Sequence, residues 1–556
     1  MYKNIDYFVE RDNMKETYGC DTMCTAKFLS STIYLQSGQT HSCYHPLPHQ
    51  VELEEIKDNP SAIHNSQHKI KRRKEMMLGM RPQECNYCWR VEEMGPEHLS
   101  DRIIKSKNEL LLSPNAHEHI KENGWDHNYQ PTYIEISFGN ECNMRCAYCH
   151  PKASSAWMKE MDLEGPLEFA NHLQVLEEKI YPEDDNPYVD AFWKWWPQLR
   201  KHLKVIRITG GEPLLQQNAW KFLDKLDDTG ECKDMIVQIN TNLNIKTKLI
   251  KRMCDKVNKL LDENKIKKFA IFSSIESWGD RATYTRNGLD LELFETNLKT
   301  IMKEMGHQHV DKFSGIQIMN TFNIMSVTSY TQFLEKMIDW RQKLQKGKDY
   351  PKVSFDIPHC TEPNHWTLVG LPDSYDNYFD LISEFFEIHK WKANWQKFPK
   401  AEHDDQYFNF FSEEEVRSWD RVKSYWRSIM ENRAKVNTEH YLEPYQIDDA
   451  RRNWYLFIRA TDKRRNTDFL KTFPEMKDYF DLCGTLFEIE NMPYNQSVKN
   501  EMLAPGHVDF HWDDDFVWQH PRLAQSLINY RKIKNFPTRM FNDDNLIGEF
   551  GELDEG

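Results

Sequence analysis

Short runs of β-branched residues alternate with longer stretches of helical periodicity along the middle of this chain, and this alternation constrains its fold most. We count six such units, whose predicted strands span residues 133–137, 204–209, 235–240, 268–274, 316–322 and 352–357. This alternation predicts an α/β fold with a parallel sheet. Because we find no clear seventh and eighth units, we expect a partial (β/α)6 barrel or a strongly curved open sheet. Functional side chains then belong at the carboxyl ends of the strands.

The length of 556 residues allows two or three domains. We expect a small cysteine-rich module over residues 1–130, the partial barrel over 131–372, and a mostly helical region over 373–556 that covers the barrel or recognises a substrate. Residues 460–476 and 507–521 are the most distinctive stretches of the third region. We interpret the alternating polar residues of the second stretch as a strand face or a loop rather than a metal site: His507, Asp509, His511 and Asp513.

The charge of the chain limits its partners. A formal net charge of −15 argues against nucleic acid or an anionic membrane as the main partner, because phosphate binding needs concentrated Lys and Arg. We interpret the most basic stretch, residues 68–77, as the solvated face of a short helix. No apolar run reaches the roughly eighteen residues of a membrane span, and residues 1–16 contain no apolar signal core. We therefore expect a cytoplasmic protein with no membrane and no nucleic-acid partner.

Seven of the twelve cysteines fall into two clusters, which is typical of metal ligation in a reducing compartment rather than of disulfides. Three of them, Cys142, Cys146 and Cys149, follow the first predicted strand with the spacing C-x-x-x-C-x-x-C. Three thiolates need a distant fourth ligand to complete a structural zinc site. Alternatively, they hold three irons of a four-iron, four-sulfur cluster, whose fourth iron stays open to a substrate or cofactor.

Three further strand ends carry residues suited to a polar ligand. The second strand runs into ITGGEPLL (208–215), where two glycines let backbone approach a ligand and Glu212 offers a carboxylate to an ammonium group. A plain Gly-Gly turn is the alternative interpretation. The third strand ends in QINTNLN and the fourth in FSSIESWGDRATYTRNG. All three stretches belong to the edge of the sheet that carries the cysteine loop.

The cysteine loop, with aromatic Tyr148 before its last cysteine, resembles the signature of the radical S-adenosylmethionine (radical SAM) enzymes. The matching stretches span about residues 131–372. The resemblance implies a radical SAM barrel in which Cys142, Cys146 and Cys149 hold a [4Fe-4S] cluster that binds S-adenosylmethionine. It also implies that a reductase supplies an electron, and that the cofactor is cleaved to a 5′-deoxyadenosyl radical that abstracts hydrogen from a substrate.

The resemblance further implies which residues contact the cofactor. Glu212 is expected at the methionine amino group, Ser274 and Glu276 at the ribose hydroxyls, and Arg286 at the methionine carboxylate. The complete implied set is Gly210, Gly211, Glu212, Pro213, Asn242, Ser274, Glu276, Arg286 and Tyr148.

Four other cysteines form a second candidate metal site. Cys85 and Cys88 are spaced C-x-x-C, with Cys24 and Cys43 upstream, and the spacing allows a zinc tetrahedron or a full cluster. The surrounding sequence resembles the twitch-type auxiliary domain of certain radical SAM proteins, although such domains usually follow the barrel. This resemblance implies an auxiliary [4Fe-4S] cluster used in electron transfer. Cys20 is a possible substitute for Cys24, and we interpret the nearby histidines as solvated: His41, His45 and His49.

The remaining cysteines are more often structural than functional. Cys254 lies on the apolar stripe of a predicted helix with Ile250, Val257 and Leu261, and we assign it to the core. Cys232 is predicted to lie in a loop. Cys360 follows the sixth strand, where a substrate would arrive, so it is a candidate hydrogen-atom donor, although a packed core cysteine is the interpretation we favour.

The sequence contains no feature that identifies the substrate. By analogy with proteins that carry auxiliary domains, a peptide or protein side chain is our first expectation. The alternatives are a small metabolite or sugar, altered by a dehydrogenase or epimerase reaction, and a non-catalytic iron-sulfur or zinc protein.

Overall fold

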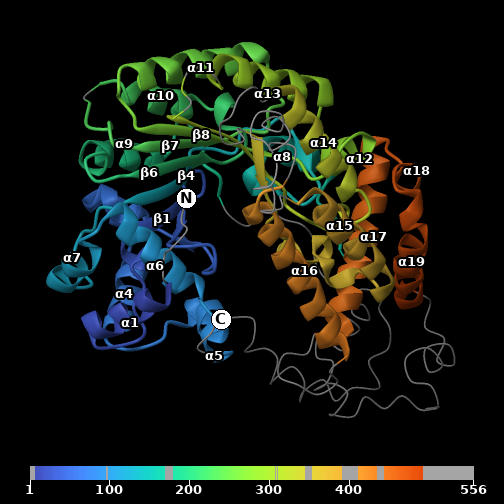
Figure 1. The fold of residues 1–556 in the computed structure, drawn as a ribbon, viewed down its shortest axis with the longest axis horizontal. Coiled ribbons are helices and arrows are strands. Elements are labelled where there is room, and N and C mark those ends of the chain that lie inside the picture. The colour runs from blue at the N-terminus through green and yellow to red at the C-terminus, as the bar shows by residue number, and fades with distance from the viewer. Residues whose placement is uncertain are drawn as a thin grey trace, which may run out of the picture.

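The computed structural model describes residues 7–491 except 96–97, 170–178, 229, 307–308, 310, 345–352, 391–410 and 435–443. The stretch 507–521, with its alternating His and Asp residues, lies outside the described residues. Figure 1 shows one sheet with helices along its outer side, the N-terminal helices below one end of the sheet, and the C-terminal helices beyond the other end.

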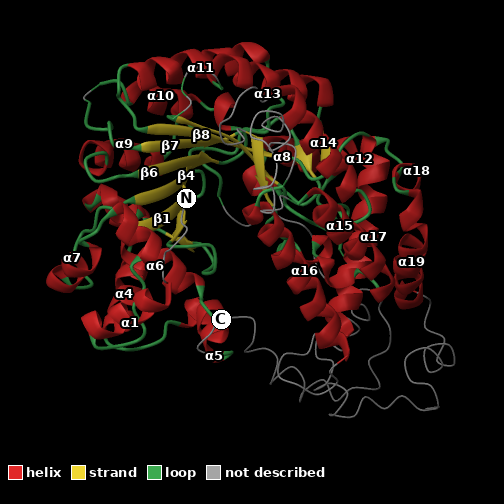
Figure 2. Cartoon of the chain, viewed as in Figure 1, coloured by secondary structure: helices red, strands yellow, loops and turns green. Residues whose placement is uncertain are grey.

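A nine-stranded sheet runs in the order β11-β10-β8-β7-β6-β4-β1-β2-β3. Six of its strands are parallel neighbours in chain order, and they lie where the β-branched runs predicted them (Figure 2). The predicted α/β fold with a parallel sheet is therefore confirmed. These six strands are β4 (Tyr133–Ser137), β6 (Val205–Thr209), β7 (Ile236–Asn240), β8 (Lys268–Ser274), β10 (Phe313–Met319) and β11 (Val353–Asp356).

The two faces of the parallel strands differ. Aliphatic side chains such as Ile136, Ile208 and Ile239 are buried on one face and belong to the main core. Helices on the outer side of the sheet contribute to the same core: α9 (Pro187–Leu199), α10 (Gln217–Lys225), α11 (Thr247–Asp262), α13 (Leu291–Met305) and α14 (Tyr330–Leu344). The other face is mostly polar and half-buried: Tyr133, Glu135, Arg207, Gln238, Asn240, Phe272, Ser274, Gln317, Met319, Ser354 and Asp356.

Helix α11 follows the third of the six parallel strands and tests the predicted helical stripe. Ile250, Cys254, Val257 and Leu261 are all buried, as a 3.6-residue period requires of one face. The assignment of Cys254 to the core is confirmed. Cys232 does lie in a loop between α10 and β7, but it is buried there rather than exposed.

The N-terminal segment shares the main sheet. β1 (Ser30–Tyr34) pairs in parallel with β4 and antiparallel with β2 (Gln39–His41), which in turn pairs with β3 (His49–Gln50). The Glu109 carboxylate accepts hydrogen bonds from the hydroxyls of Ser30 and Thr132, next to this junction. The helices of the segment are α1 (Tyr7–Tyr18), α2 (Ala26–Leu29), α3 (Leu53–Asp58), α4 (Gln67–Met77), α5 (Asn86–Glu93), α6 (Asp101–Leu112) and α7 (Ala116–Asn123).

The interpretation of residues 68–77 as a solvated face is wrong for two of the basic residues. Lys69 and Arg73 on α4 are buried. The Lys69 ammonium donates to the Ser31 hydroxyl (2.6 Å), and the Arg73 guanidinium donates to the Asn65 side chain (2.8 Å). His41 is also buried rather than solvated, and burial lowers its pKa to about 4. Hydrogen bonds inside the fold replace the water that we expected around these residues.

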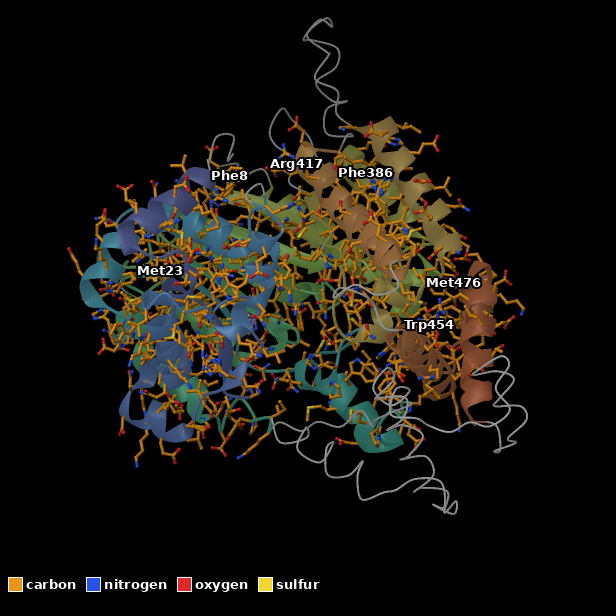
Figure 3. All side chains as sticks on the ribbon, turned by 90° about the horizontal axis from the view of Figure 1, so that it is seen from below. Phe8, Met23, Phe386, Arg417, Trp454 and Met476 are labelled. Carbon is orange, nitrogen blue, oxygen red and sulfur yellow. The ribbon has the colours of Figure 1, made fainter. Side chains whose placement is uncertain are left out.

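The C-terminal region is helical over its described residues and packs into the core of the sheet. It contains α15 (Asp376–His389), α16 (Glu413–Ala434), α17 (Pro444–Arg465), α18 (Phe469–Thr472) and α19 (Lys477–Asn491). In Figure 3, Phe386 and Arg417 lie close together on α15 and α16, whereas Trp454 and Met476 lie near each other toward α17 and α19. None of the helices described is long and apolar enough to cross a membrane.

Candidate functional site

The three-cysteine loop joins β4 to α8 (Ser155–Glu164), and short strand pairing fixes its second half. β5 (Arg145–Cys146) pairs antiparallel with β9 (Arg286–Asn287), with Cys146 opposite Arg286. The next amide, of Ala147, donates to the carbonyl of Thr285 (2.8 Å). The loop is therefore attached to the segment that follows β8, the fourth predicted strand.

Two more strand ends contact the first half of the loop. The Glu212 amide, beyond β6, donates to the Glu141 carbonyl (2.7 Å). The Asn242 side chain, beyond β7, donates to the Asn143 side chain (2.9 Å). The structure thus brings together all four strand ends that the sequence identified. Parallel strands produce this arrangement because their carboxyl ends meet at one edge of the sheet.

The three thiols of the loop are half-buried and close to one another. Burial raises the pKa of Cys149 to about 12, and the neighbouring thiols of Cys146 and Cys142 add to the rise. Burial also raises the pKa of Cys146, but the Arg286 guanidinium, with Nη1 3.5 Å from the sulfur, opposes this rise. Arg286 alone does not offset the raised pKa values of these three thiols. A bound cationic group would stabilise their thiolate forms, so the loop is suited to such a group.

The two glycines beyond β6 allow the cysteine loop to lie against this strand end. Gly210 has φ +112°, and a Cβ there would lie 2.6 Å from the Ser137 hydroxyl oxygen and 2.7 Å from the Gly139 carbonyl oxygen. A Cβ on Gly211 would lie 2.4 Å from the Glu141 carbonyl oxygen. Both glycines are therefore required by backbone packing in the protein itself, in addition to any ligand contact.

Glu212 is fully buried between two strand ends. Its carboxylate accepts hydrogen bonds from the amides of Asn242 (2.6 Å) and Leu214 (3.2 Å). Burial raises its pKa to about 7, although these amide hydrogen bonds oppose the rise. Pro213 is buried beside it. The expected contact of Glu212 with an ammonium group stays a prediction, which the raised pKa favours because a cation would stabilise the ionised carboxylate.

Three predicted cofactor contacts form one buried cluster. The Arg286 Nε lies 2.7 Å from a carboxylate oxygen of Glu276, and the Tyr148 hydroxyl donates to the other oxygen (2.5 Å). Ser274 lies two residues before Glu276, half-buried at the end of β8. The sequence assigned Glu276 and Arg286 to different parts of the cofactor, whereas the structure pairs them with each other. Their separate contacts with a cofactor stay predictions.

Cys360 is packed, as we favoured. It is 3% exposed, and its thiol donates to the carbonyl of Glu362 (3.1 Å). Burial raises its pKa to about 12, and the Glu276 carboxylate contributes to this rise. Cys360 therefore lies near the Tyr148–Glu276–Arg286 cluster, and its role as a hydrogen-atom donor stays a prediction.

The sequence did not predict the side chains of α8 and α17 that support the cysteine loop. The Trp157 indole on α8 donates to the Cys146 carbonyl (2.9 Å). Glu160, one turn later, accepts two hydrogen bonds from Arg465 of α17 (both 3.1 Å) and one from Arg145 of the loop (2.8 Å). Arg465 belongs to the distinctive stretch 460–476, in which Phe469, Phe473 and Met476 are also buried in the core. Glu160 lies on α8, where no sequence pattern predicted a contact with the loop.

The four N-terminal cysteines of the second candidate site line one cavity. Cys24, Cys43, Cys85 and Cys88 surround it, together with Lys27, Asp101, Arg102 and Lys105. Cys20 is elsewhere and its thiol donates to the Met76 carbonyl (3.6 Å). Burial raises the pKa of both Cys85 and Cys88 to about 12. Over the described part of the chain, no three His, Cys, Asp or Glu side chains form a ready-made site for a metal ion.

The chain was compared with known proteins. No protein-family model matches it. It is 27% identical over 111 residues to GTP 3',8-cyclase of Campylobacter lari (20% of this chain, 28% of the relative) and 33% identical over 110 residues to that of Helicobacter pylori J99 (20% and 27%). With the enzyme of the same name from Desulforamulus reducens, identity is 23% over 178 residues (32% and 48%). The chain thus spans less than half the length of each of these relatives.

A comparison with solved structures found two of Streptococcus suis SuiB. SuiB alone matches with a TM-score of 0.30 and 12% identity, covering 65% of this chain and 68% of that chain. SuiB bound to precursor peptide SuiA matches with a TM-score of 0.29 and 13% identity, covering 65% and 69%.

Proposed function

Because the chain belongs to the radical SAM superfamily of enzymes, we propose that it cleaves S-adenosylmethionine reductively and abstracts a hydrogen atom from a substrate. Cys142, Cys146 and Cys149 would hold a [4Fe-4S] cluster, which with S-adenosylmethionine supplies the 5′-deoxyadenosyl radical. The observation that carries this proposal is the attachment of the cysteine loop to the ends of β6, β7 and β8. These ends contain the residues expected at the cofactor.

The residues of this chain would have distinct tasks around the cofactor. Glu212, whose carboxylate is already oriented by two amides, would bind the methionine amino group. Ser274 would bind the ribose, with Glu276 as its partner. Arg286 would supply positive charge beside Cys146, which favours the thiolate form of that ligand. Tyr148 orients the Glu276 carboxylate through its hydroxyl group.

The cavity lined by Cys24, Cys43, Cys85 and Cys88 supports an auxiliary [4Fe-4S] cluster as part of the same proposal. Four thiols around a cavity suit a cluster with four cysteine ligands, because such a cluster fills the space between its ligands. A zinc ion would draw the four sulfurs to about 2.3 Å from one point. With all four ligand positions taken by cysteine, this site would transfer electrons. A reductase would be the external donor, and a peptide or protein side chain is our first candidate substrate.

The experiment that tests the function is anaerobic reconstitution with iron and sulfide. The protein is then treated with dithionite and S-adenosylmethionine, and 5′-deoxyadenosine is measured. We expect release by the wild-type protein and none by the triple variant C142A/C146A/C149A. Absent release from the wild type, or equal release from the triple variant, would contradict the proposal.

A further inference from the structure

Two charged side chains lie next to each other on the polar face of the parallel sheet. Glu135 of β4 and Arg207 of β6 are partners in the register of these strands. Both are half-buried, while their neighbours along the chain, such as Ile136 and Ile208, are fully buried on the opposite face. The helices that cover the outer face therefore leave both charges partly open to solvent or to a ligand.

Apart from Glu135, the side chains that contact Arg207 are neutral. Its Nε donates to the Asn240 side chain (2.8 Å), and its guanidinium carbon lies 3.9 Å from the centre of the Phe272 ring. The Tyr133 hydroxyl is nearby: burial and the Glu135 carboxylate raise its pKa to about 12, and Arg207 opposes this rise. Within the described chain, Arg207 forms no ion pair with a carboxylate. A stacked and oriented guanidinium can hold a carboxylate through two parallel N–H bonds.

Glu135 is held by the N-terminal segment. The Tyr44 hydroxyl donates to its carboxylate (2.6 Å), and the Lys105 ammonium lies 4.5 Å from the centre of the Tyr44 ring. Tyr44 directly follows Cys43, one of the cysteines around the N-terminal cavity. Tyr44 therefore links Glu135 to two residues that line that cavity, Cys43 and Lys105.

Arg207 also lies close to the strand ends that form the candidate site. Phe272, under the guanidinium, precedes Ser274 by two residues on β8, which corresponds to about 7 Å along a strand. Arg207 precedes Gly210 by three residues, or about 10 Å. A ligand held at Arg207 would thus lie within the length of a small molecule or an amino-acid side chain of the predicted cofactor contacts.

We propose that Arg207, oriented by Asn240 and stacked on Phe272, binds a carboxylate of the substrate. Glu135 beside it offsets much of the charge of Arg207, so binding depends on the oriented guanidinium, whose planar fork matches a carboxylate, rather than on net positive charge. The substrate is then a carboxylic acid or a peptide with an exposed carboxylate. This inference rests on the proposed function, because it places the anchored carboxylate beside the predicted radical site.

The test measures ligand binding, separately from radical chemistry. Saturation-transfer NMR on the reconstituted full-length protein would observe two ligands, acetate and N-acetyl-L-glutamate amide. Inorganic phosphate, which has no carbon-bound protons to observe, would be added as a competitor. We expect Arg207→Gln to reduce transfer to acetate at least fivefold and Arg207→Lys to reduce it less. Gln317→Ala, on the same half-buried face, is the matched control and should change transfer less than twofold. Stronger transfer to the glutamate amide than to acetate would indicate a peptide source.

Two results would overturn this inference. The first is unchanged acetate transfer in Arg207→Gln at an unchanged melting temperature. The second is phosphate that displaces acetate from the wild type more effectively than N-acetyl-L-glutamate amide does. If Arg207→Gln does not fold, the Arg207→Lys variant is used instead, because it retains the charge and loses the planar fork. Unchanged acetate transfer in Arg207→Lys would then overturn the inference. Wild-type release of 5′-deoxyadenosine without added substrate tests the proposed function separately, so either hypothesis can fail while the other stands.

Discussion

The two cysteine sites of this protein are built in opposite ways. Cys142, Cys146 and Cys149 come from eight consecutive residues and are half-buried. The other four cysteines come from three separate segments, and only Cys43 among them is not fully buried. A local loop with three thiols leaves one side of a bound group open, whereas four thiols around a cavity enclose it. Under the proposed function, the loop would serve chemistry on a ligand and the cavity would serve electron transfer.

The sites also differ in what holds them. The loop is supported by hydrogen bonds to three strand ends and by the buried Glu160–Arg465 pair. The cavity is bordered instead by cationic side chains, among which Lys27 and Arg102 are buried. Substitutions near the loop should therefore change its stability and iron retention, whereas substitutions near the cavity should change the reduction potential of the group bound there.

The largest expected effect separates the two sites by their iron. We expect Cys85→Ala with Cys88→Ala to remove about half of the iron, because one of two four-iron clusters is lost. This double variant should still release 5′-deoxyadenosine from S-adenosylmethionine, whereas C142A/C146A/C149A should retain half of the iron and release none. Iron analysis and chromatography of the product provide both measurements.

Two outcomes would break this comparison. If the double variant retains all of its iron, the N-terminal cavity does not hold a cluster. If the wild-type protein contains one zinc ion and only about four irons, the cavity is a zinc site and the electron-transfer role fails.

The next largest effect is expected from the buried Glu160–Arg465 pair that supports the loop. Glu160→Gln leaves the buried Arg465 guanidinium without its carboxylate, and both side chains are only 3% exposed. We expect a loss of about 3 kcal/mol in stability, detected as a lower melting temperature, and faster loss of iron from the loop. Arg417→Met, which breaks an exposed i,i+4 pair with Glu413, is the control and should leave both unchanged. Equal iron loss in the two variants would show that the pair does not support the loop.

The sequence predicted the parallel strands and the strand ends, but not the supports around them. Strand positions follow from period-two burial and β-branched residues, which are local properties. The convergence of Cys146, Glu212 and Asn242 follows from parallel topology once those strands are placed. Contacts such as Glu160 with Arg465 join residues 305 positions apart, and no local period encodes them. The burial of Lys69 and Arg73 was missed for the same reason, because their partners are set by tertiary packing.

A smaller effect tests the junction between the N-terminal segment and the sheet. Burial raises the pKa of Glu109 from 4.5 to about 7, so the folded protein binds this proton more tightly than the unfolded chain does. Its contribution to stability is complete below pH 4.5 and is lost as the pH rises through about 7, by about 3 kcal/mol. We expect Glu109→Gln to reduce the fall in melting temperature between pH 5 and 8, and the exposed control Glu122→Gln to leave it unchanged. An equal fall in both variants would contradict this prediction.

The smallest expected effect is that of the Lys27 charge on the reduction potential of the N-terminal site. Lys27 is 2% exposed, lines the cysteine cavity and forms an ion pair with Glu84. A cluster gains negative charge on reduction, so a buried cation beside it favours the reduced state. We expect Lys27→Met to lower the reduction potential of the N-terminal cluster by tens of millivolts and to leave the potential of the loop cluster unchanged, in a redox titration followed by electron paramagnetic resonance. Lys71→Met, on the exposed side of α4, should shift neither potential. An unchanged or raised potential in Lys27→Met would show that Glu84 already neutralises this charge, and the two sites would then differ in their ligands alone.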